Sequence, residues 1–472
     1  MEDEVANGRD VLWITLESVR QDRTSMGGHD RDTTPKLRRL ADRDDAASFD
    51  RCFSHDIWTR SSTASILTGC APCGHGTWTP ETALRPSVPT IPELLSEHGY
   101  RTAAISQISQ FSHATGLDRG FDDFHYLSME TLVEEVGIPR LLRFLATVRR
   151  HSAGLTTVKN KHCLGYLEQA LAKRQIREAA AGDDPLFLYV HHGDSHHAYY
   201  PPRPWQSRFE DELELPLSDA LDVSLDMSER IHEHVANGLP FDDAEWNAIE
   251  VCYDAAVAYV DQLAGDLAAF ARDRLDDPIV VVTADHGELF GEAGCLAHML
   301  TVNDAVSNVP LVVSGLDGTD GLDTDQLVQH ADVMQMILSD LGVDVDLPAG
   351  RDIRERARGV AVTQHSGERL RHKLDVIADR NSSFDTSRYH QSDLTSVRTR
   401  RYRYSHSDDR SELFELPNED DDVSDEHAEV VTSFGDLVEG WLDEHETDRS
   451  DAVHRAEFTE EMERQLEQLG YV

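Results

Sequence analysis

The sequence predicts an α/β fold in which a mainly parallel β-sheet is sandwiched between helices, followed by a small C-terminal α+β subdomain. Short apolar runs rich in β-branched residues alternate with stretches of helical periodicity, as in sheets with crossover helices. Polar clusters follow three of these runs, where ligand chemistry sits in such sheets. The pattern changes near Gly350, so we expect a catalytic domain at 1–349 and a subdomain at 350–472.

The first part of the catalytic domain opens with a strand and a helix. Val11–Leu16 is a short, uncharged apolar run, as expected of a buried parallel strand. Thr34-Pro35 predicts the start of a helix, because proline suits the first helical position. Further strands are expected at Ala47–Phe53, Arg101–Ile105 and Pro185–His191, and helices at Ser62–Leu67, Thr90–His98 and within 129–181.

The second part is anchored by one long helix. Glu245–Arg274 carries an apolar pattern with the helical period. We expect 203–244 to be acidic, irregular surface insertions, and 350–390 to be rich in loops. The remaining predictions are strands at Pro278–Thr283, Val309–Val313 and Glu412–Leu416, a strand pair in Leu394–Tyr404, an acidic loop at Asn418–Glu426, a polar linker after it, and helices at Val328–Leu341 and Ala456–Leu469.

The chain is strongly acidic, with 88 Asp and Glu against 44 Lys and Arg, a net charge of −44. We take the excess to run through the whole chain. It indicates either a surface for a cationic partner or a protein that stays soluble in concentrated salt, where repulsion is screened. The even spread favours the second explanation and predicts a halophilic archaeal source. Nucleic acid is not expected as a partner, because we find no basic stripe to neutralise phosphates.

The N-terminus gives no sign of export. Met1–Glu4 is acidic and leads directly into an apolar strand, unlike a signal peptide. No apolar run approaches the ~20 residues that a membrane-spanning helix needs. We therefore expect a cytoplasmic protein without a stable membrane anchor.

Carboxylates and a histidine at strand ends predict a metal site. Asp285-His286 follows a buried strand, and Glu17 ends the first one. Carboxylate and imidazole together suit a divalent ion such as manganese, zinc or magnesium. Taken singly, Asp285 is as well explained by a turn in which it caps the next element, and Glu17 alone is a weak signal.

A hydroxyl-rich segment, Trp58–Gly69, supplies the expected nucleophile. A hydroxyl just before a helix meets free backbone N–H groups and the positive end of the helix dipole, which would hold a tetrahedral anion. Ordinary capping by Ser or Thr is the competing explanation. Histidines that could protonate a leaving oxygen occur in His192–His197, which follows a strand, and at His75 and His298 in glycine-containing loops.

Taken together, these segments resemble the sulfatase family of the alkaline-phosphatase superfamily. The match covers roughly residues 10–445, and the order and number of its blocks make it specific. The blocks are Ile14–Arg20, Thr33–Leu37, Thr59–Gly69 with Pro72 and His75-Gly76, Gly99–Ala103 with Gly120–Asp122, Leu186–Pro202, Thr283–Glu288 with Gly291–Gly294 and His298, and Ser396–Thr399 with Glu412–Leu416.

The resemblance implies an alkaline-phosphatase-like fold and hydrolysis of sulfuric or phosphoric esters. It implies one divalent metal ion (manganese, magnesium, zinc or calcium) held by Glu17, Asp285 and His286. Thr59 aligns with the nucleophile, which also touches the metal. Two histidines align with positions that contact the ester group, and three further residues are expected to bind substrate. The first pair is His196 and His298, the latter where many sulfatases carry lysine; the other three are His75, Gln107 and His197.

Departures from the family pattern shift the expected chemistry toward phosphorus. Typical sulfatases carry Cys or Ser followed by x-Pro-Ser-Arg and convert the first residue to formylglycine. Here Thr59 stands at that position, with Ser61 for the proline and Thr63 for the arginine. Threonine cannot give an aldehyde at that carbon, so formylglycine is not expected. The second carboxylate after Glu17 is replaced by Ser18. The set resembles the phosphoglycerol-transferase branch, which includes lipoteichoic acid synthases.

We therefore expect in-line attack by a metal-bound Thr59 on a phosphoester or phosphodiester. The substrate would be a small molecule or a glycan or lipid-headgroup ester. Two alternatives stay open at this point. One is a true sulfatase, in which Ser61 or Ser62 would have to be modified. The other is a non-catalytic anion-binding protein that kept the fold.

Overall fold

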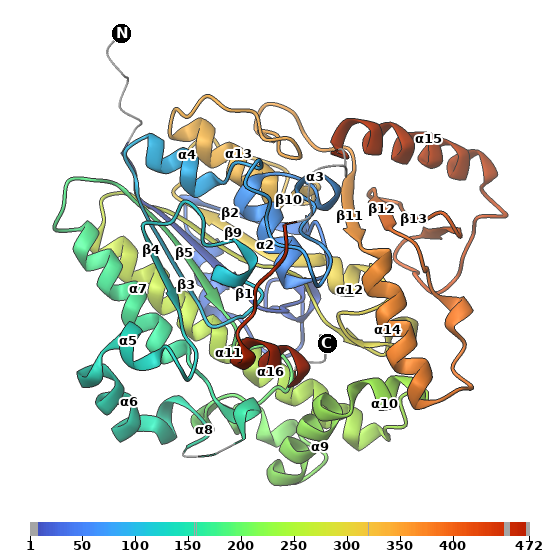
Figure 1. The fold of residues 1–472 in the computed structure, drawn as a ribbon, viewed down its shortest axis with the longest axis horizontal. Helices are drawn as coiled ribbons and strands as arrows, with labels where there is room; N and C mark the ends of the chain where they lie inside the picture. The colour runs from blue at the N-terminus through green and yellow to red at the C-terminus, as the bar shows by residue number, and fades with distance from the viewer. Residues whose placement is uncertain (1–7, 155, 157, 320, 448–453, 469–472) are drawn as a thin grey trace.

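A computed structural model describes residues 8–154, 156, 158–319, 321–447 and 454–468. Its centre is an eight-stranded sheet with the strand order β10-β2-β9-β6-β1-β5-β3-β4 (Figure 1). β9 runs antiparallel to its neighbours β2 and β6, and the other pairs are parallel, which confirms the mainly parallel sheet. The strands are β1 Val11–Leu16, β2 Ala46–Phe53, β3 Arg101–Ser106, β4 Asp123–Tyr126, β5 Leu186–His192, β6 Ile279–Ala284, β9 Asn308–Ser314 and β10 Val328–Gln329.

The three central strands end at the same level. Every residue of β1, β5 and β6 is buried, which requires cover on both faces of the sheet. Their β-branched and aromatic side chains suit such a buried position. Leu16 at the end of β1 pairs with His192 and with Ala284. The residues that follow these strands therefore meet at one edge of the sheet.

Two groups of helices provide the cover. α11 packs on both α1 and α7; α7 and α11 lie beside β1, β3 and β5, and α1 lies beside β2 and β9. On the other side, α2 packs with α4 and α13. α11 begins with a capping box between Asp242 and Glu245. The helices of the catalytic part are α1 Pro35–Ala41, α2 Thr59–Thr68, α3 Pro72–His75, α4 Ile91–Glu97, α5 Leu132–Val136, α6 Ile138–His151, α7 Gly165–Ala179, α8 Arg203–Gln206, α9 Leu217–Glu229, α10 Ile231–Ala236, α11 Asp243–Arg274, α12 Asp304–Ser307 and α13 His330–Asp340.

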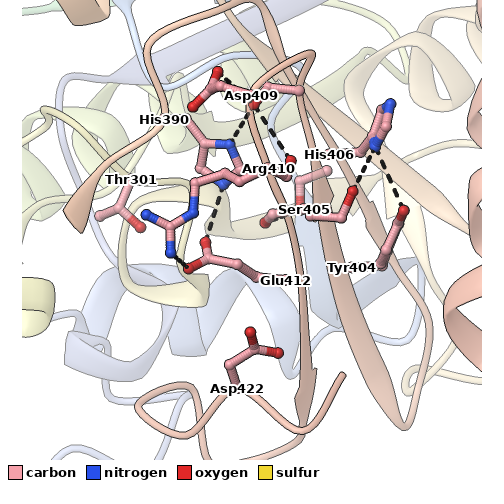
Figure 2. Close-up of polar contacts among 12 residues, drawn as sticks. Thr301, His390, Tyr404, Ser405, His406, Asp409, Arg410, Glu412 and Asp422 are labelled. Carbon is pink, nitrogen blue, oxygen red and sulfur yellow. Dashed lines mark hydrogen bonds and ion pairs between the residues drawn. The ribbon is translucent and has the colours of Figure 1, made fainter. Parts of the chain in front are cut away.

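The C-terminal part forms a second sheet, which confirms the predicted small α+β subdomain. The order is β11-β12-β13-β14, and every pair is antiparallel. Polar side chains tie its strands to the preceding loop: His390 Nε2 lies 3.0 Å from Glu412 Oε2, and Arg410 pairs with the same carboxylate (Figure 2). The elements are β11 Ala361–His365, α14 Gly367–Arg380, β12 Leu394–Arg398, β13 Tyr402–His406, β14 Ser411–Glu415, α15 Ala428–His445 and α16 Glu460–Gln468.

Short elements complete the chain. A two-stranded hairpin, β7 Leu289–Phe290 with β8 Leu296–Ala297, follows β6. No helix of the described residues is both long and apolar enough to cross a membrane. Single 3-10 turns lie at Gln21–Arg23, His113–Thr115, Lys159–Lys161, Glu210–Glu212, Glu292–Gly294 and Thr386–Arg388.

Several expected elements were wrong. The hydroxyl-rich helix α2 begins at Thr59, three residues before the predicted start. The region 203–244 holds α8, α9 and α10, and 350–390 holds β11 and α14. α15 occupies much of the expected polar linker. The last helix begins at Glu460 and not at Ala456, and its predicted end, Leu469, lies outside the described residues. Val328–Gln329 is a strand that precedes α13.

Candidate metal and nucleophile site

Three segments bring the predicted metal ligands and nucleophile together. Glu17 follows β1, Asp285 and His286 follow β6, and Thr59 is the first residue of α2. One ligand atom each from Glu17, Asp285 and His286 lie within 4.8 Å of one another, and all three residues are buried. Residues separated by more than 260 positions in the sequence thus form a single cluster at the carboxyl edge of the sheet.

Local hydrogen bonds orient the ligand atoms. His286 Nδ1 lies 2.9 Å from the Gly287 carbonyl oxygen, to which it donates, so Nε2 presents its lone pair to the cluster. Asp285 Oδ1 accepts from the backbone N–H groups of Ser18 at 3.1 Å and His286 at 3.0 Å. These bonds leave Asp285 Oδ2 for a further partner.

Thr59 points its hydroxyl into the cluster. Its Oγ1 donates to Glu17 Oε1 at 2.7 Å and lies 3.3 Å from His286 Nε2. Because Thr59 occupies the first turn of α2, the free N–H groups of that turn lie beside the same hydroxyl. Ser62, one turn on, donates to the Asp285 carbonyl oxygen at 2.7 Å and so fastens α2 to the end of β6.

The backbone of both ligand-bearing turns is specialised. A Cβ added at Gly287 would lie 2.1 Å from the Ala305 carbonyl oxygen, so glycine is the residue that fits there. Ser18 has φ 56°, a left-handed conformation that costs free energy for a residue with a side chain. Tyr253 holds it by donating to the Ser18 carbonyl oxygen at 2.9 Å.

The two carboxylates carry opposed pKa shifts. Burial by itself raises the pKa of Glu17, but His191 and His286 outweigh burial and hold that pKa at about 2. Burial and the negative charge of Glu17 raise the pKa of Asp285 to about 6. The side chains alone therefore leave negative charge incompletely balanced, and a cation between them would favour ionisation of both groups.

The donor set fits a divalent cation. Glu17 Oε2 and Asp285 Oδ2 are buried and accept no hydrogen bond from any of the described residues. Such oxygens cost free energy unless a partner is present. Two carboxylates, one imidazole and one hydroxyl are ligands that manganese, zinc and magnesium accept.

His191 belongs to the cluster and was missed as a site residue in the sequence. It pairs with Thr15 across β1 and β5, so its side chain is on the same face as that of Glu17 two residues later. His191 Nε2 lies 2.8 Å from Glu17 Oε2 and 3.7 Å from Asp285 Oδ2, without the alignment of a hydrogen bond. Burial lowers the pKa of His191, but Glu17 and Asp285 outweigh it and raise that pKa.

Three other histidines surround the cluster. The ring centroid of His298 lies 4.3 Å from that of His286 and 5.3 Å from that of His196. His197 lies 4.1 Å from His196, again between ring centroids. Burial is the largest cause that lowers the pKa of each of these three histidines. For His298, the neighbouring histidines lower the pKa further. The protein alone therefore holds these imidazoles neutral near pH 7.

A cavity of about 180 Å³ opens beside the cluster. Glu17, Gln107, His196 and His197 line it, as does Glu461 of α16. The structure thus places Gln107, expected to bind substrate, at the cavity wall. Gln107 Nε2 donates to Asp194 Oδ1 at 3.1 Å, which fixes the amide.

His75 lies elsewhere. Its Nδ1 accepts from the Thr77 N–H at 2.9 Å, and its Nε2 lies 3.1 Å from Ser65 Oγ. Ser65 is well beyond Thr59 along α2, so these contacts let His75 hold the helix in place. A contact between His75 and the substrate stays a prediction.

α14 brings two cationic side chains that the sequence did not reveal, because loops were expected there. The Arg369 guanidinium carbon lies 3.7 Å from the centre of the Trp58 ring, next to the start of α2. Lys373 Nζ lies 3.3 Å from His232 Nε2, and burial lowers the pKa of Lys373 to about 7. Arg369 can supply positive charge where the motif carries Thr63 in place of arginine.

Comparison with known sequences supports the family resemblance of this chain. The sulfatase family profile matches residues 9–343. The uncharacterized sulfatase YidJ of Escherichia coli strain K12 is 22% identical over 325 residues, which are 63% of this chain. The match spans 62% of that protein, so the chain covers less than two thirds of its curated relative.

Solved structures share the fold. A phosphonate monoester hydrolase of Agrobacterium radiobacter superposes with a TM-score of 0.69 at 19% identity, over 93% of this chain and 96% of that one. A protein crystallised with its substrate D-glucosamine-2-N,6-O-disulfate superposes with a TM-score of 0.66 at 16% identity, over 94% and 99% of the two chains.

Proposed function

The chain belongs to the sulfatase family, and from that premise we propose that it is a metal-dependent hydrolase of phosphate esters, with Thr59 as its nucleophile. The position of the Thr59 hydroxyl carries the proposal. It lies 2.7 Å from Glu17 Oε1 and 3.3 Å from His286 Nε2, among the three proposed metal ligands. A threonine that merely capped a helix would have no reason to face two such groups.

Glu17, Asp285 and His286 would hold the divalent ion, with Thr59 beside them. The ion would supply positive charge that lowers the pKa of the hydroxyl and neutralises the ester oxygens. Manganese, magnesium, zinc and calcium all accept such ligands. Glu17 Oε2 and Asp285 Oδ2, which are buried and accept no hydrogen bond from the described residues, support this assignment.

The remaining steps belong to the protein's own residues. Thr59 Oγ1 gives its proton toward Glu17 Oε1, its hydrogen-bond acceptor, and attacks phosphorus in line with the leaving oxygen. The first N–H groups of α2 stabilise the equatorial oxygens. His298, with His196 beside it, protonates the leaving oxygen, since an anionic ester raises the pKa of a neighbouring imidazole. Water then releases phosphate from Thr59.

Phosphorus is favoured over sulfur for a chemical reason. The aldehyde on which typical sulfatases depend cannot form at Thr59. Ser62, one of the two serines that a sulfatase would have to use instead, donates its hydroxyl to the Asp285 carbonyl oxygen at 2.7 Å. Phosphonate monoesters belong in the same test, because the similar structure from Agrobacterium radiobacter is named for that activity.

The decisive experiment compares Thr59→Ala, Thr59→Ser and a control on nitrophenyl esters of sulfate, phosphate, phosphodiester and phosphonate, each with manganese, magnesium, zinc or calcium. Loss of a nucleophile lowers kcat on the order of 10⁶-fold, and serine should restore part of it. Thr68→Ala is the matched control, because Thr68 is buried at the other end of the same helix, where its hydroxyl donates to the Ala64 carbonyl oxygen at 2.7 Å and accepts from the Cys70 N–H at 3.2 Å. Full activity of Thr59→Ala on every ester would contradict the proposal.

A further inference from the structure

The large exposed apolar side chains of the described residues are concentrated in the segment that connects β4 to β5. Within the described part of the chain, six large hydrophobic side chains are exposed, from Val158 at 38% to Ile138 at 62%, and all of them lie between residues 129 and 158. Single exposed apolar residues scattered over a surface need no explanation, whereas a gathering of this kind marks an interaction surface. The six are Met129, Val133, Ile138, Leu142, Leu145 and Val158.

α6 carries the centre of this surface. Ile138, Leu142 and Leu145 follow the spacing i, i+4, i+7 and so form one stripe along the helix. Phe144 and Val148 are buried, so the helix is anchored by a different face. Figure 1 shows α5 and α6 at the periphery of the molecule, where the stripe can reach a large partner.

Part of the same segment is basic, in contrast to the rest of the chain. Between residues 138 and 177 the sequence has nine Lys and Arg and a single acidic residue, Glu168, in a chain of net charge −44. The expectation of an evenly spread acidic excess, and of no basic stripe, is therefore wrong for this segment. The nine are Arg140, Arg143, Arg149, Arg150, Lys159, Lys161, Lys173, Arg174 and Arg177.

Five of these cations have no carboxylate partner among the described residues. Arg140, Arg143, Arg150, Lys173 and Arg177 line a groove of about 940 Å³, and none of them forms an ion pair with a carboxylate of the described residues. Elsewhere in the chain, buried arginines such as Arg20, Arg358 and Arg398 are paired. The cost of gathering unpaired like charges indicates an anionic partner.

The two carboxylates of the groove are directed to other partners. Asp261 accepts the backbone N–H groups of Lys36 and Leu37 at 2.9 and 2.8 Å. Asp266 pairs with Lys36 Nζ at 3.1 Å. The arginines of α6 and α7 therefore keep their charge for a ligand outside the chain.

We propose that α6, with the end of α5, docks this protein on the surface of an anionic lipid bilayer. Leu142 and its neighbours in the stripe would enter the boundary between headgroups and acyl chains, and Arg143 and Arg150 would contact the anionic headgroups beside it. A basic amphipathic helix with exposed leucines is built for such an interface. Nucleic acid would use the arginines and leave the apolar stripe in water.

The position of the substrate cavity favours a bilayer over a second copy of the chain. Met129 is 58% exposed and also lines the cavity that holds Glu17 and His196. A second copy seated on this face would cover the mouth of the cavity, whereas a lipid surface would present esters to it. That last consequence rests on the proposed function; the docking itself does not.

Vesicle sedimentation tests the docking. The full-length protein is mixed with phosphatidylcholine vesicles, with or without phosphatidylglycerol, over a range of salt concentrations. The protein should bind the anionic vesicles, and more weakly as salt screens the charges. The triple variant Ile138→Ser, Leu142→Ser, Leu145→Ser should lose binding on the order of 100-fold. Arg143→Glu with Arg150→Glu should lose on the order of 100-fold on anionic vesicles alone.

Controls keep the result specific. Arg401→Glu removes another exposed arginine, from the C-terminal sheet, where it pairs with Glu415, and this variant should bind vesicles as the unmodified protein does. The changed side chains of the triple variant are exposed, so its thermal unfolding should be unchanged. No binding to anionic vesicles, or full binding by the triple variant, would overturn the proposal. Dimerisation that the same triple variant abolishes, without vesicle binding, would assign the surface to a second copy instead. The assay does not use catalysis, so it separates this proposal from the proposed function.

Discussion

Replacing His191 by glutamine should weaken binding of a divalent metal about 10- to 100-fold. His191 Nε2 lies 2.8 Å from Glu17 Oε2 and 3.7 Å from Asp285 Oδ2, and all three side chains are buried. His191 therefore holds the Glu17 carboxylate in position by an ion pair. Loss of partners that orient metal ligands costs about 10- to 100-fold in metal affinity.

Isothermal titration of manganese or zinc into chelator-treated protein measures this effect. His192→Gln is the matched control, because His192 is the next residue of β5 and equally buried. Its Nδ1 contacts Glu168 Oε2 at 2.7 Å, away from the cluster. That variant should lose stability but keep its metal affinity. Unchanged affinity in His191→Gln, or an equal loss in both variants, would refute the assignment of His191 to the metal cluster.

Three further predictions concern the surroundings of the site. Arg369→Met should raise KM for anionic esters about tenfold, because a charge-assisted contact contributes about 1.5 kcal/mol; steady-state kinetics showing an unchanged KM would contradict it. Burial lowers the pKa of His330 to about 4. The folded state holds this imidazole neutral, so the free energy of unfolding is highest above pH 6.5 and decreases as pH falls toward 4. That loss is about 2 kcal/mol at pH 5, and His330→Gln should therefore lose less unfolding free energy between pH 7 and pH 5 in denaturant titrations. Leu466→Ala should weaken the packing of α16 on Trp58 by about 2 to 3 kcal/mol, seen as faster proteolysis of α16, and an unchanged cleavage rate would argue against that contact.

The strands of the central sheet could be predicted because their burial leaves a plain signature. Val11–Leu16 and Ile279–Ala284 are apolar except for one threonine each, and each strand was predicted within one residue of its observed bounds. The direction of β9 could not be predicted, since a buried strand has the same composition whichever way it runs. α9 was missed because its apolar residues alternate with Asp219, Asp222 and Asp226, which look like an irregular acidic segment.

The candidate metal cluster was predictable only in part, because its members come from strands far apart in the sequence. Glu17, Asp285 and His286 each follow a recognisable strand, so the sheet edge brings them together. His191 lies inside β5, and its closeness to Glu17 follows from the register between two strands 175 residues apart, which no local pattern contains. Arg369 depends on α14, whose position relative to α2 is a property of the folded chain.

The pairing of β1 with β6 has a consequence for synthesis. Val11 pairs with Phe187 on one side and with Ile279 on the other, so one edge of this apolar strand leaves the ribosome long before its partner exists. At about 5 to 20 residues per second, the delay until β6 is synthesised is about 15 to 50 s. During that time an unpaired, aggregation-prone edge of the strand is exposed to other nascent chains. The acidic charge of the growing chain would repel those chains, and a chaperone that shields apolar strands would be the natural companion of its production.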